Sequence, residues 1–398
     1  MIGDVPKGWS KKTIGDFADV TSGGTPSTNI SEYWNGKIRW MNSGELNDKK
    51  VYDVVGRITE EGLKKSNTKL IPKKCILIGL AGQGKTRGTI ALNFVELCIN
   101  QSIGAIYPND SFIPEYLYYN LNLRYKELRN LSTGGEGRGG LNLSILRDIL
   151  VLLPPLKEQE KISNILTAID DLIEETDKIV SSCTNIKRGL IQSLLLKGMP
   201  NRHKKFKTTE IGNIPDDWEI KRLEEVSTFL DGKRVPIKEG DRSKIKGIHP
   251  YYGASGIIDY VNDYIFDEEL ILLGEDGANI LTRSLPLAFK VKGKIWVNNH
   301  AHVIKPHEDM NIDYLTIYLE SLDYAKYNTG TAQPKLNQEM CSNIIIVKPN
   351  MSEQNEIADI IETFNERVQS EKTKKQQLIK LKLSLMQKLL SGEIRVKA

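Results

Sequence analysis

Two spacings of apolar residues alternate along the chain. Short apolar runs flanked by glycine or proline are typical of buried strands, and examples are CILIGL at 75–80, ILVLLP at 149–154 and NIIIV at 343–347. After Pro155 the apolar residues step by three and four positions, and this seam comprises Ile162, Ile165, Ile169, Leu172, Thr176, Ile179, Cys183, Ile186 and Leu190. Such heptad spacing predicts a long helix with a coiled-coil seam.

The same heptad spacing returns near the C-terminus. Its apolar positions are Ile357, Ile360, Phe364, Val368, Leu378, Leu381, Leu385 and Leu389, interrupted by the polar stretch EKTKKQQ at 371–377. Pro155 suits a first helical turn and Ser352 an N-cap, while Gly198 and Gly392 follow the last apolar turns as stops. Each predicted helix has about 40 residues and is roughly 60 Å long at about 1.5 Å per residue, so its seam needs a partner.

The chain is an internal repeat. The opening segment 2–23 returns at 211–232, and the residues kept at matching places are Gly3 and Gly212, Pro6 and Pro215, Trp9 and Trp218, and Gly23 and Gly232. The strand-like ILIGLAG at 76–82 matches ILLGEDG at 271–277, and the stretches 99–110 and 133–166 match 297–309 and 329–361. Because the matches keep their order, we predict a unit that occurs twice along the chain and consists of a globular domain followed by a helix. We call the globular domain of each unit its reader. The expected boundaries are readers at 1–154 and 200–349 and spacer helices at 155–199 and 350–398.

The connection between the two copies predicts how the helices pair. Only a short basic linker, around Asn201 to Thr209, separates the first helix from the second reader. Parallel helices would require this linker to run back roughly 60 Å, which about ten residues at about 3.5 Å each do not reach. We therefore expect an α+β protein with two α/β-type globular readers, separated by two long antiparallel helices that form a coiled coil with pseudo-two-fold symmetry.

Composition sets the class of protein. With 398 residues, of which 39% are hydrophobic, the chain is long enough for two globular domains. It contains no apolar run of the roughly 18 to 20 residues that span a membrane, and its N-terminus lacks the apolar core of a secretory signal, so we expect a cytoplasmic protein. Four scattered cysteines, Cys75, Cys98, Cys183 and Cys341, predict free thiols without a zinc framework. The net charge of +4 and the pI near 8.6 do not by themselves identify the partner.

The stretch GLAGQGKT at 79–86 matches the nucleotide-binding P-loop literally. A P-loop leads directly into a helix whose N-terminus holds phosphate, whereas RGTIAL follows here and the matching GEDGANILTRS lacks the Lys-Thr pair. We favour a glycine-rich turn that presents Lys85 and Arg87 to DNA phosphates over a P-loop enzyme.

An acidic segment and a group of histidines could suggest a nuclease site or a metal site, but we interpret both as ordinary surface features. The acidic PDDWEIK at 215–221 is interpreted as an exposed turn rather than a nuclease site, because its acids lie too close together and the first copy has PKGWSKK. His300, His302 and His307 are interpreted as polar loop residues rather than metal ligands, with DNA contact by one of them as an alternative. No metal site is expected.

Two glycine-rich loops carry side chains of the kinds that contact base edges in DNA. The segment TGGEGRGG at 133–140 carries Arg138, and TGTAQPK at 329–335 carries Gln333 and Lys335. Such side chains suit base edges, because Arg favours guanine and Gln favours adenine. Further candidates are Lys37, Arg39, Arg234 and Arg283. For each of them the alternative interpretation is an ordinary solvated charge. Trp9 and Trp218 recur at one place in both copies and are predicted to belong to the core.

Taken together, these motifs resemble the specificity subunits of type I restriction-modification enzymes over nearly the whole chain. The resemblance rests on the entry P-x-x-W in both copies, GGTPS…YWNGKIRWMNSGEL at 23–46, Asn100 with Gln101, and PPLKEQEKI at 154–162, echoed by PNMSEQNEI at 349–357. The second copy departs from it, since GKRVPIKEG at 232–240 replaces the GGTPS stretch.

That resemblance implies two target recognition domains, which read the unequal halves of a bipartite, asymmetric double-stranded DNA site. It implies that the helices set the gap between the half-sites and dock two methyltransferase subunits, with restriction and translocase subunits joining through the complex. The spacer and docking positions are Ile162, Ile165, Ile169, Leu172, Ile179, Ile186, Leu190, Ile357, Ile360, Phe364, Leu378 and Leu385. The resemblance also implies no catalytic residue and no cofactor in this chain, with S-adenosylmethionine, ATP and Mg²⁺ in the partner subunits and no membrane partner. The remaining alternatives are a P-loop ATPase or nuclease acting alone and a coiled-coil scaffold that does not touch DNA.

Overall fold

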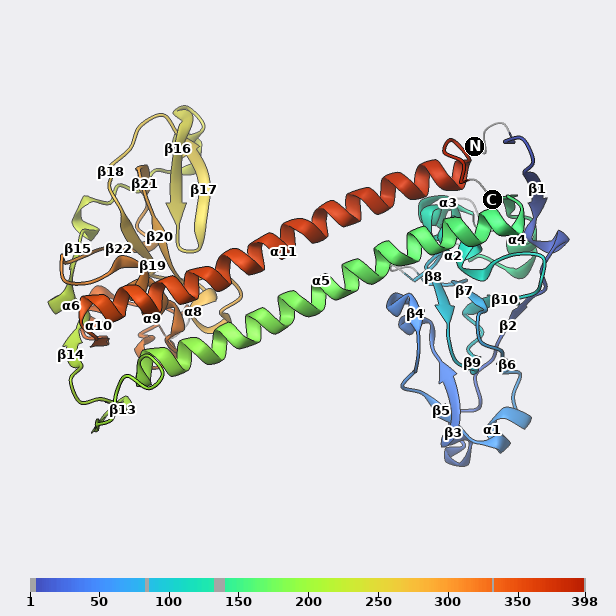
Figure 1. Ribbon diagram of the computed structural model, residues 1–398, viewed down its shortest axis with the longest axis horizontal. Coiled ribbons are helices and arrows are strands. Elements are labelled where there is room, and N and C mark those ends of the chain that lie inside the picture. Colours follow the sequence, from blue (N-terminus) through green and yellow to red (C-terminus); the bar gives the residue numbers. More distant parts are fainter. Residues whose placement is uncertain (1–4, 83–85, 132–139, 331–332, 397–398) are drawn as a thin grey trace. The chain divides into compact units, whose positions relative to one another are not determined.

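The computed structural model describes residues 5–82, 86–131, 140–330 and 333–396. By its internal contacts the chain divides into two units, Met1–Asp177 with Thr373–Ala398, and Lys178–Lys372. Each unit contains one reader of mixed strands and short helices together with a part of both long helices (Figure 1).

The first reader is built on a five-stranded sheet with the order β2-β10-β7-β8-β4. Its strands are β2 (Val20–Ser22), β10 (Ile103–Ile106), β7 (Ile76–Gly79), β8 (Ile90–Asn93) and β4 (Lys50–Val51). The predicted buried run at 75–80 forms β7, whose residues are all buried. Helix α2 (Pro114–Leu123), which begins with a proline at its first turn, packs against β7 and β8.

A second, four-stranded sheet of the first reader has the order β5-β3-β9-β6. The strands are β5 (Arg57–Ile58), β3 (Trp34–Met41), β9 (Leu97–Ile99) and β6 (Leu70–Ile71), and β3 pairs with β9 in parallel. A separate pair joins β1 (Ser10–Thr13) to β11 (Leu150–Leu153). The short helices are α1 (Glu60–Lys64), α3 (Tyr125–Asn130) and α4 (Leu143–Arg147).

The second reader repeats this topology. Its central sheet has the order β15-β22-β19-β20, with β15 (Ser227–Phe229), β22 (Ala301–Pro306), β19 (Leu270–Gly274) and β20 (Ala288–Val291). The end strands also recur, as β14 (Glu219–Arg222) paired with β23 (Ile345–Lys348). Helix α9 (Ile312–Ser321) takes the place of α2, and its Tyr314 hydroxyl donates to Val347 O at 2.8 Å, as the Tyr116 hydroxyl donates to Leu152 O at 2.8 Å in the first reader.

The repeat extends beyond the matched sequence. The order β17-β16-β21-β18 mirrors β5-β3-β9-β6, including one parallel pair, although the sequences of this region show no match. The strands are β16 (Lys246–Gly253), β17 (Gly256–Val261), β18 (Phe266–Asp267) and β21 (Lys294–Val297). The other elements are the hairpin β12 (Phe206–Thr209) and β13 (Gly212–Pro215), and the helices α6 (Leu223–Val226), α7 (Glu239–Arg242), α8 (Asn279–Thr282) and α10 (Gln338–Ser342).

Two long helices follow the readers, α5 (Leu156–Lys197) and α11 (Met351–Ser391). In the first unit Asp170 pairs with Lys382, and Asp177 pairs with Lys375 at 2.6 Å, so α11 runs backwards as α5 advances. In the second unit Lys187 donates to Asn365 Oδ1 at 2.7 Å, and the backbone N–H of Met199, just past α5, donates to Glu353 at 2.9 Å. Within each unit the two helices are therefore antiparallel, as predicted (Figure 1).

The predicted seam of α5 is right at alternate positions and wrong between them. Ile162 and Ile169 are buried, but Ile165 is 37% exposed while the neighbouring Leu166 is fully buried. Leu172 and Ile186 are likewise exposed, and their successors Ile173 and Lys187 are half-buried instead. The seam therefore steps by four and then three from Ile162. At 165–166 and 172–173 both residues are apolar, so the apolar pattern alone does not show which of the two faces the core. In the folded chain the second residue of each pair is the more buried, and Leu166 packs in the core that α11 and the first reader share.

The remaining seam positions also divide by burial. Ile179, Leu190, Ile360, Phe364, Leu378 and Leu385 are half-buried, and Ile357 is fully buried. In α11, Ile361, Met386 and Leu390 are buried and complete the core of their units.

Candidate nucleic-acid interface

In the first reader the P-loop-like segment lies in a β-hairpin. Strand β7 ends at Gly79, and the chain returns as the antiparallel strand β8, with Gly79 N bonded to Thr89 O at 3.0 Å and Gly88 N to Gly79 O at 2.9 Å. Because a strand follows the motif, the described residues on either side of 83–85 present no helix N-terminus to a nucleotide phosphate. Lys85 lies outside the described residues, and Arg87 is 9% exposed.

Both readers place a loop segment against the end of this central strand. In the first reader Leu141 N donates to Leu80 O at 2.8 Å, and in the second reader Leu336 N donates to Glu275 O at 2.7 Å. We call residues Gln333–Leu336 the second reading segment, because it ends the predicted DNA-reading loop. Arg138, the candidate of the first loop, lies outside the described residues.

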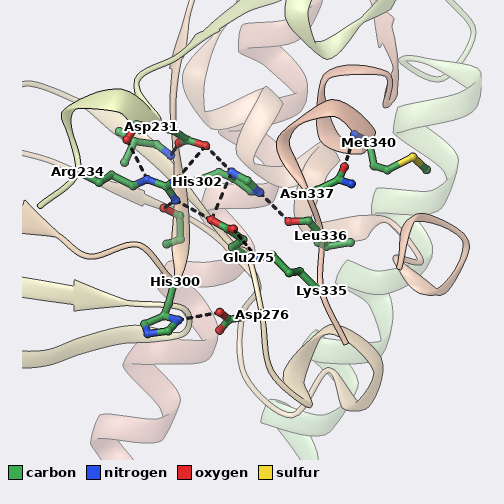
Figure 2. Close-up of polar contacts among 12 residues, drawn as sticks. Asp231, Arg234, Glu275, Asp276, His300, His302, Lys335, Leu336, Asn337 and Met340 are labelled. Atoms are coloured by element: carbon green, nitrogen blue, oxygen red, sulfur yellow. Dashed lines mark hydrogen bonds and ion pairs between the residues drawn. The ribbon is translucent and has the colours of Figure 1, made fainter. Parts of the chain in front are cut away.

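Polar side chains gather around the second reading segment. Gln333 is exposed, and the Lys335 side chain is 52% exposed and lies 3.4 Å from Glu275 Oε1. Beside it His300, on the turn that enters β22, contacts Asp276 Oδ2 through Nδ1 at 2.7 Å (Figure 2). Carboxylates, amides and cations at a surface are the groups that read base edges in DNA.

Beneath this surface lies a buried charge network of four residues, Asp231, Arg234, Glu275 and His302 (Figure 2). His302 Nδ1 is 2.6 Å from Asp231 Oδ2, and Arg234 Nη1 is 2.7 Å from Glu275 Oε2. Arg234 also donates to the carbonyls of Asp231 and Ala301 at 3.1 and 2.9 Å. The two carboxylates are thus balanced by two cationic side chains, as burial of charge requires.

His302 is charged in this setting. Its Nδ1 faces a carboxylate, and its Nε2 lies 3.0 Å from the carbonyl oxygen of Leu336. Both partners only accept hydrogen bonds, so both ring nitrogens must carry protons. Burial lowers the pKa of His302, but hydrogen bonds to Asp231 and Cys341 outweigh this effect and raise that pKa to about 10.

Several predicted DNA contacts have protein partners instead. Arg234 belongs to the buried network, Arg283 pairs with Glu320 at 2.9 Å, and Arg39 pairs with Asp53 at 2.7 Å. Lys37 is exposed on β3. The reading roles of these residues stay predictions. Of the two lysine candidates that the structure describes, Lys37 is exposed and the Lys335 side chain is 52% exposed.

Two equivalent buried acid sites, one in each unit, were missed by sequence reasoning. The carboxylate of Glu158, near the start of α5, accepts from the Trp9 indole at 3.1 Å, and Glu353, near the start of α11, accepts from the Trp218 indole at 3.0 Å. The glutamines that follow, Gln159 and Gln354, bond Pro154 O and Pro349 O at 2.8 and 2.9 Å. The Glu-Gln pair in both copies was the available signal.

The segment beyond each long helix completes these two acid sites. Arg395, beyond α11, donates to both oxygens of Glu158 at 2.8 Å, while His203, beyond α5, lies 2.9 Å from Glu353 Oε1. Trp9 and Trp218 are buried, as predicted. These sites join each reader to its helix.

Within the described residues, no three His, Cys, Asp or Glu side chains are arranged to hold a metal ion. The three histidines of the sequence pattern are separated in role, since His302 is buried and His307 contacts Thr228. None of the described helices is long and apolar enough to cross a membrane.

The comparisons with known proteins give the same answer in both halves of the chain. A family model described as "Type I restriction modification DNA specificity domain" matches residues 6–181 and again 215–380. This double match confirms the internal repeat.

Relatives match over nearly the full length. The specificity subunit of the type I restriction enzyme MjaVIII of Methanocaldococcus jannaschii is 27% identical, covering 99% of this chain and 94% of the relative. That of MjaIX from the same organism is 28% identical, covering 99% and 95%. The EcoR124I/EcoR124II subunit of Escherichia coli is 30% identical over 40% of this chain and 41% of its own.

Solved structures share the fold. The S subunit of a type I restriction-modification system from M. genitalium superposes with a TM-score of 0.64 at 16% identity, covering 98% of this chain and 97% of that one. A chain from a structure of type I system assembly superposes with a TM-score of 0.59 at 14% identity, covering 98% and 100%. With two readers of one topology, each joined to a long helix and each matched by the same family model, the chain belongs to the DNA specificity subunits of type I restriction-modification systems.

Proposed function

We propose that the chain selects a bipartite, asymmetric site in double-stranded DNA, one half-site per reader, and leaves chemistry to its partners. The observation that supports this best is a shared backbone framework with different side chains at the reading edge. Leu80, Ser102 and Gly104 of the first reader correspond to Glu275, His300 and His302 of the second. Two readers of one shape and unlike surfaces suit two unlike sequences.

We propose further that residues 1–154 and 200–349 are the target recognition domains and that 155–199 and 350–398 form the spacer. Two methyltransferase subunits dock on the spacer, and restriction and translocase subunits join through that complex. Apolar side chains left exposed on the helices support docking, and they include Ile165, Leu172, Ile186, Ile379, Leu381 and Leu383. S-adenosylmethionine, ATP and Mg²⁺ belong to the partner subunits, and the complex acts in the cytoplasm.

The test is an exchange of the first reader. Residues 1–154 are replaced by the reader of another specificity subunit, and methylated adenines are mapped in DNA exposed to the assembled enzyme. One half-site should change while the other half-site and the gap are kept. An unchanged site, or loss of both halves in an enzyme that still assembles, contradicts the proposal. The matched control replaces 200–349 and should change only the other half.

A further inference from the structure

The two readers fill one place in the core differently. In the first reader Gly104 lies under Leu80, and a side chain at Gly104 would begin 3.1 Å from Leu80 Cδ2 and 2.7 Å from Leu146 Cδ1. Strand pairing puts His302 at the position of Gly104, and Glu275 at that of Leu80. Leu80 and Gly104 of the first reader are therefore replaced by the charged pair Glu275 and His302 in the second reader.

The charged groups tie together four segments that are distant in sequence. Asp231 and Arg234 follow β15, Glu275 follows β19, His302 lies in β22, and Leu336 ends the second reading segment. His302 is the only one of the described residues that bonds both Asp231 and Leu336 through its side chain. Its ring therefore connects the reading segment to the core of the reader.

The second reading segment is also held by its backbone. Leu336 N donates to Glu275 O at 2.7 Å, and Gly277 N donates to Pro334 O at 3.0 Å. On the other edge Lys335 N donates to Asn328 Oδ1 at 2.8 Å. The Leu336 carbonyl, which points inward, accepts from His302, so the imidazolium secures the inner end of the segment.

Charge balance explains why an imidazolium is needed there. Asp231 and Glu275 carry two negative charges, and Arg234 supplies one positive charge. Without a charged His302, one carboxylate would lack a buried counter-ion, and the nearest exposed cation is Lys335, already 3.4 Å from Glu275. With His302 charged, Lys335 is not needed as the buried counter-ion: its pair with Glu275 at 3.4 Å stays at the surface, and its side chain is 52% exposed towards a ligand.

We propose that His302, held as a buried imidazolium, is the positioning residue of the second reading segment, and that the choice of the second half-site depends on it. The inference rests on the proposed function, since it concerns how one reader discriminates DNA. His302 acts through Gln333 and Lys335 and does not itself touch DNA, because its side chain is 1% exposed.

The decisive variant copies the first reader. Glu275→Leu with His302→Gly installs the Leu–Gly pair found at 80 and 104, and it removes one negative and one positive charge together. The full chain, assembled with its methyltransferase subunit, is presented with a pool of randomised duplexes, and the bound duplexes are sequenced. The wild-type chain should enrich two half-sites, which the reader exchange assigns. The double variant should keep the first half-site and lose at least about tenfold enrichment of the second, the scale of one base contact.

Several outcomes separate the explanations. A folded double variant with unaltered selection of the second half-site overturns the inference. A wild-type chain that enriches no sequence overturns the proposed function instead. His307→Gln, a histidine change outside the network, is the matched control and should leave both half-sites unchanged.

A second measurement needs no variant. The chain has five histidines, and the nitrogen chemical shifts of their rings report protonation directly. The assigned ring of His302 should remain doubly protonated at pH 8.5, where an imidazole with the ordinary pKa near 6.5 is neutral. If the His302 ring is neutral at that pH, the inference is wrong, whether or not the double variant folds.

Discussion

The indole N–H of Trp9 donates to the buried carboxylate of Glu158 at 3.1 Å, which fixes the entry of the first reader to the start of its helix. The second copy makes the same bond between Trp218 and Glu353 at 3.0 Å. The charge partner differs, because Arg395 pairs with Glu158 while His203 and Arg202 approach Glu353. Each bond joins residues 135 or more positions apart, so it stabilises only the folded unit.

Glu353→Ala tests how much the buried site around Glu353 contributes to the free energy of unfolding. The substitution removes the acceptor of Trp218, His203 and the Met199 N–H in a fully buried place. We expect a loss of about 3 kcal/mol in the free energy of unfolding, measured by urea denaturation. Glu356→Ala is the control, since its pair with Arg202 is exposed and its loss should change the free energy of unfolding much less. Equal losses for both variants would contradict the assignment.

The position of the helix seam gives a second prediction. Leu166→Ala removes a fully buried side chain from the core of the first unit, whereas Ile165→Ala truncates a side chain that is 37% exposed. We expect the first to cost about 3 kcal/mol, as large-to-small core changes do, and the second less than about 1 kcal/mol. Thermal unfolding of the isolated chain measures both. If Ile165→Ala costs more stability than Leu166→Ala, the seam predicted from the apolar pattern is the right one.

His302 makes stability depend on pH at the alkaline side. Its pKa is raised to about 10 in the folded chain from an ordinary value of 6.5, so protonation favours folding. The contribution is complete below pH 6.5 and is lost as pH rises through about 10. Asp231, Glu275 and Cys341 face the ring, and Arg234 balances the two acids.

His302→Gln removes this dependence. The difference in unfolding free energy between the wild type and this variant should shrink with rising pH by up to about 1.4 kcal/mol per pH unit between pH 6.5 and 10. Urea denaturation at closely spaced pH values measures it. A difference that does not change with pH would show that His302 is neutral in the folded chain.

The repeat was readable from the sequence because Gly, Pro and Trp recur where the backbone or the core requires them. The antiparallel pairing of β7 with β8 was also readable, since a β-like run follows the P-loop-like motif. The seam was only half readable, because Ile165–Leu166 and Leu172–Ile173 each offer two adjacent apolar residues, of which the second is the more buried.

The buried charge network was not readable. Asp231 and His302 are 71 positions apart, and a histidine that closely follows Asn298, Asn299 and His300 looks like part of their loop, although β22 begins at Ala301. The first copy does not predict the network either, because Gly104 and Leu80 occupy the equivalent positions and have apolar contacts there. The sequence matches and the strand pairing both show that these positions correspond, but neither shows that Asp231 and Leu336 meet His302. The second reader's parallel pair β16 and β21 was also hidden, since topology is kept there without matching residues.

Lys335→Ala separates DNA contact from stability. The side chain of Lys335 is about half exposed, whereas the guanidinium of Arg234 pairs with Glu275 and Asp231 and its side chain is 15% exposed. Lys335→Ala should weaken DNA binding about three- to tenfold and make the slope of log affinity against log salt shallower by about 1 if it meets a phosphate. Its melting temperature should stay that of the wild type, because an exposed pair at 3.4 Å adds little.

Arg234→Ala is the matched comparison. It leaves two buried carboxylates with one cation, so we expect a loss of about 3 kcal/mol in stability before any effect on DNA is measured. Titration of labelled duplex at several salt concentrations, beside thermal unfolding of the same samples, measures both properties. If Lys335→Ala lowers the melting temperature and leaves the salt slope unchanged, Lys335 is part of the buried network and does not contact DNA.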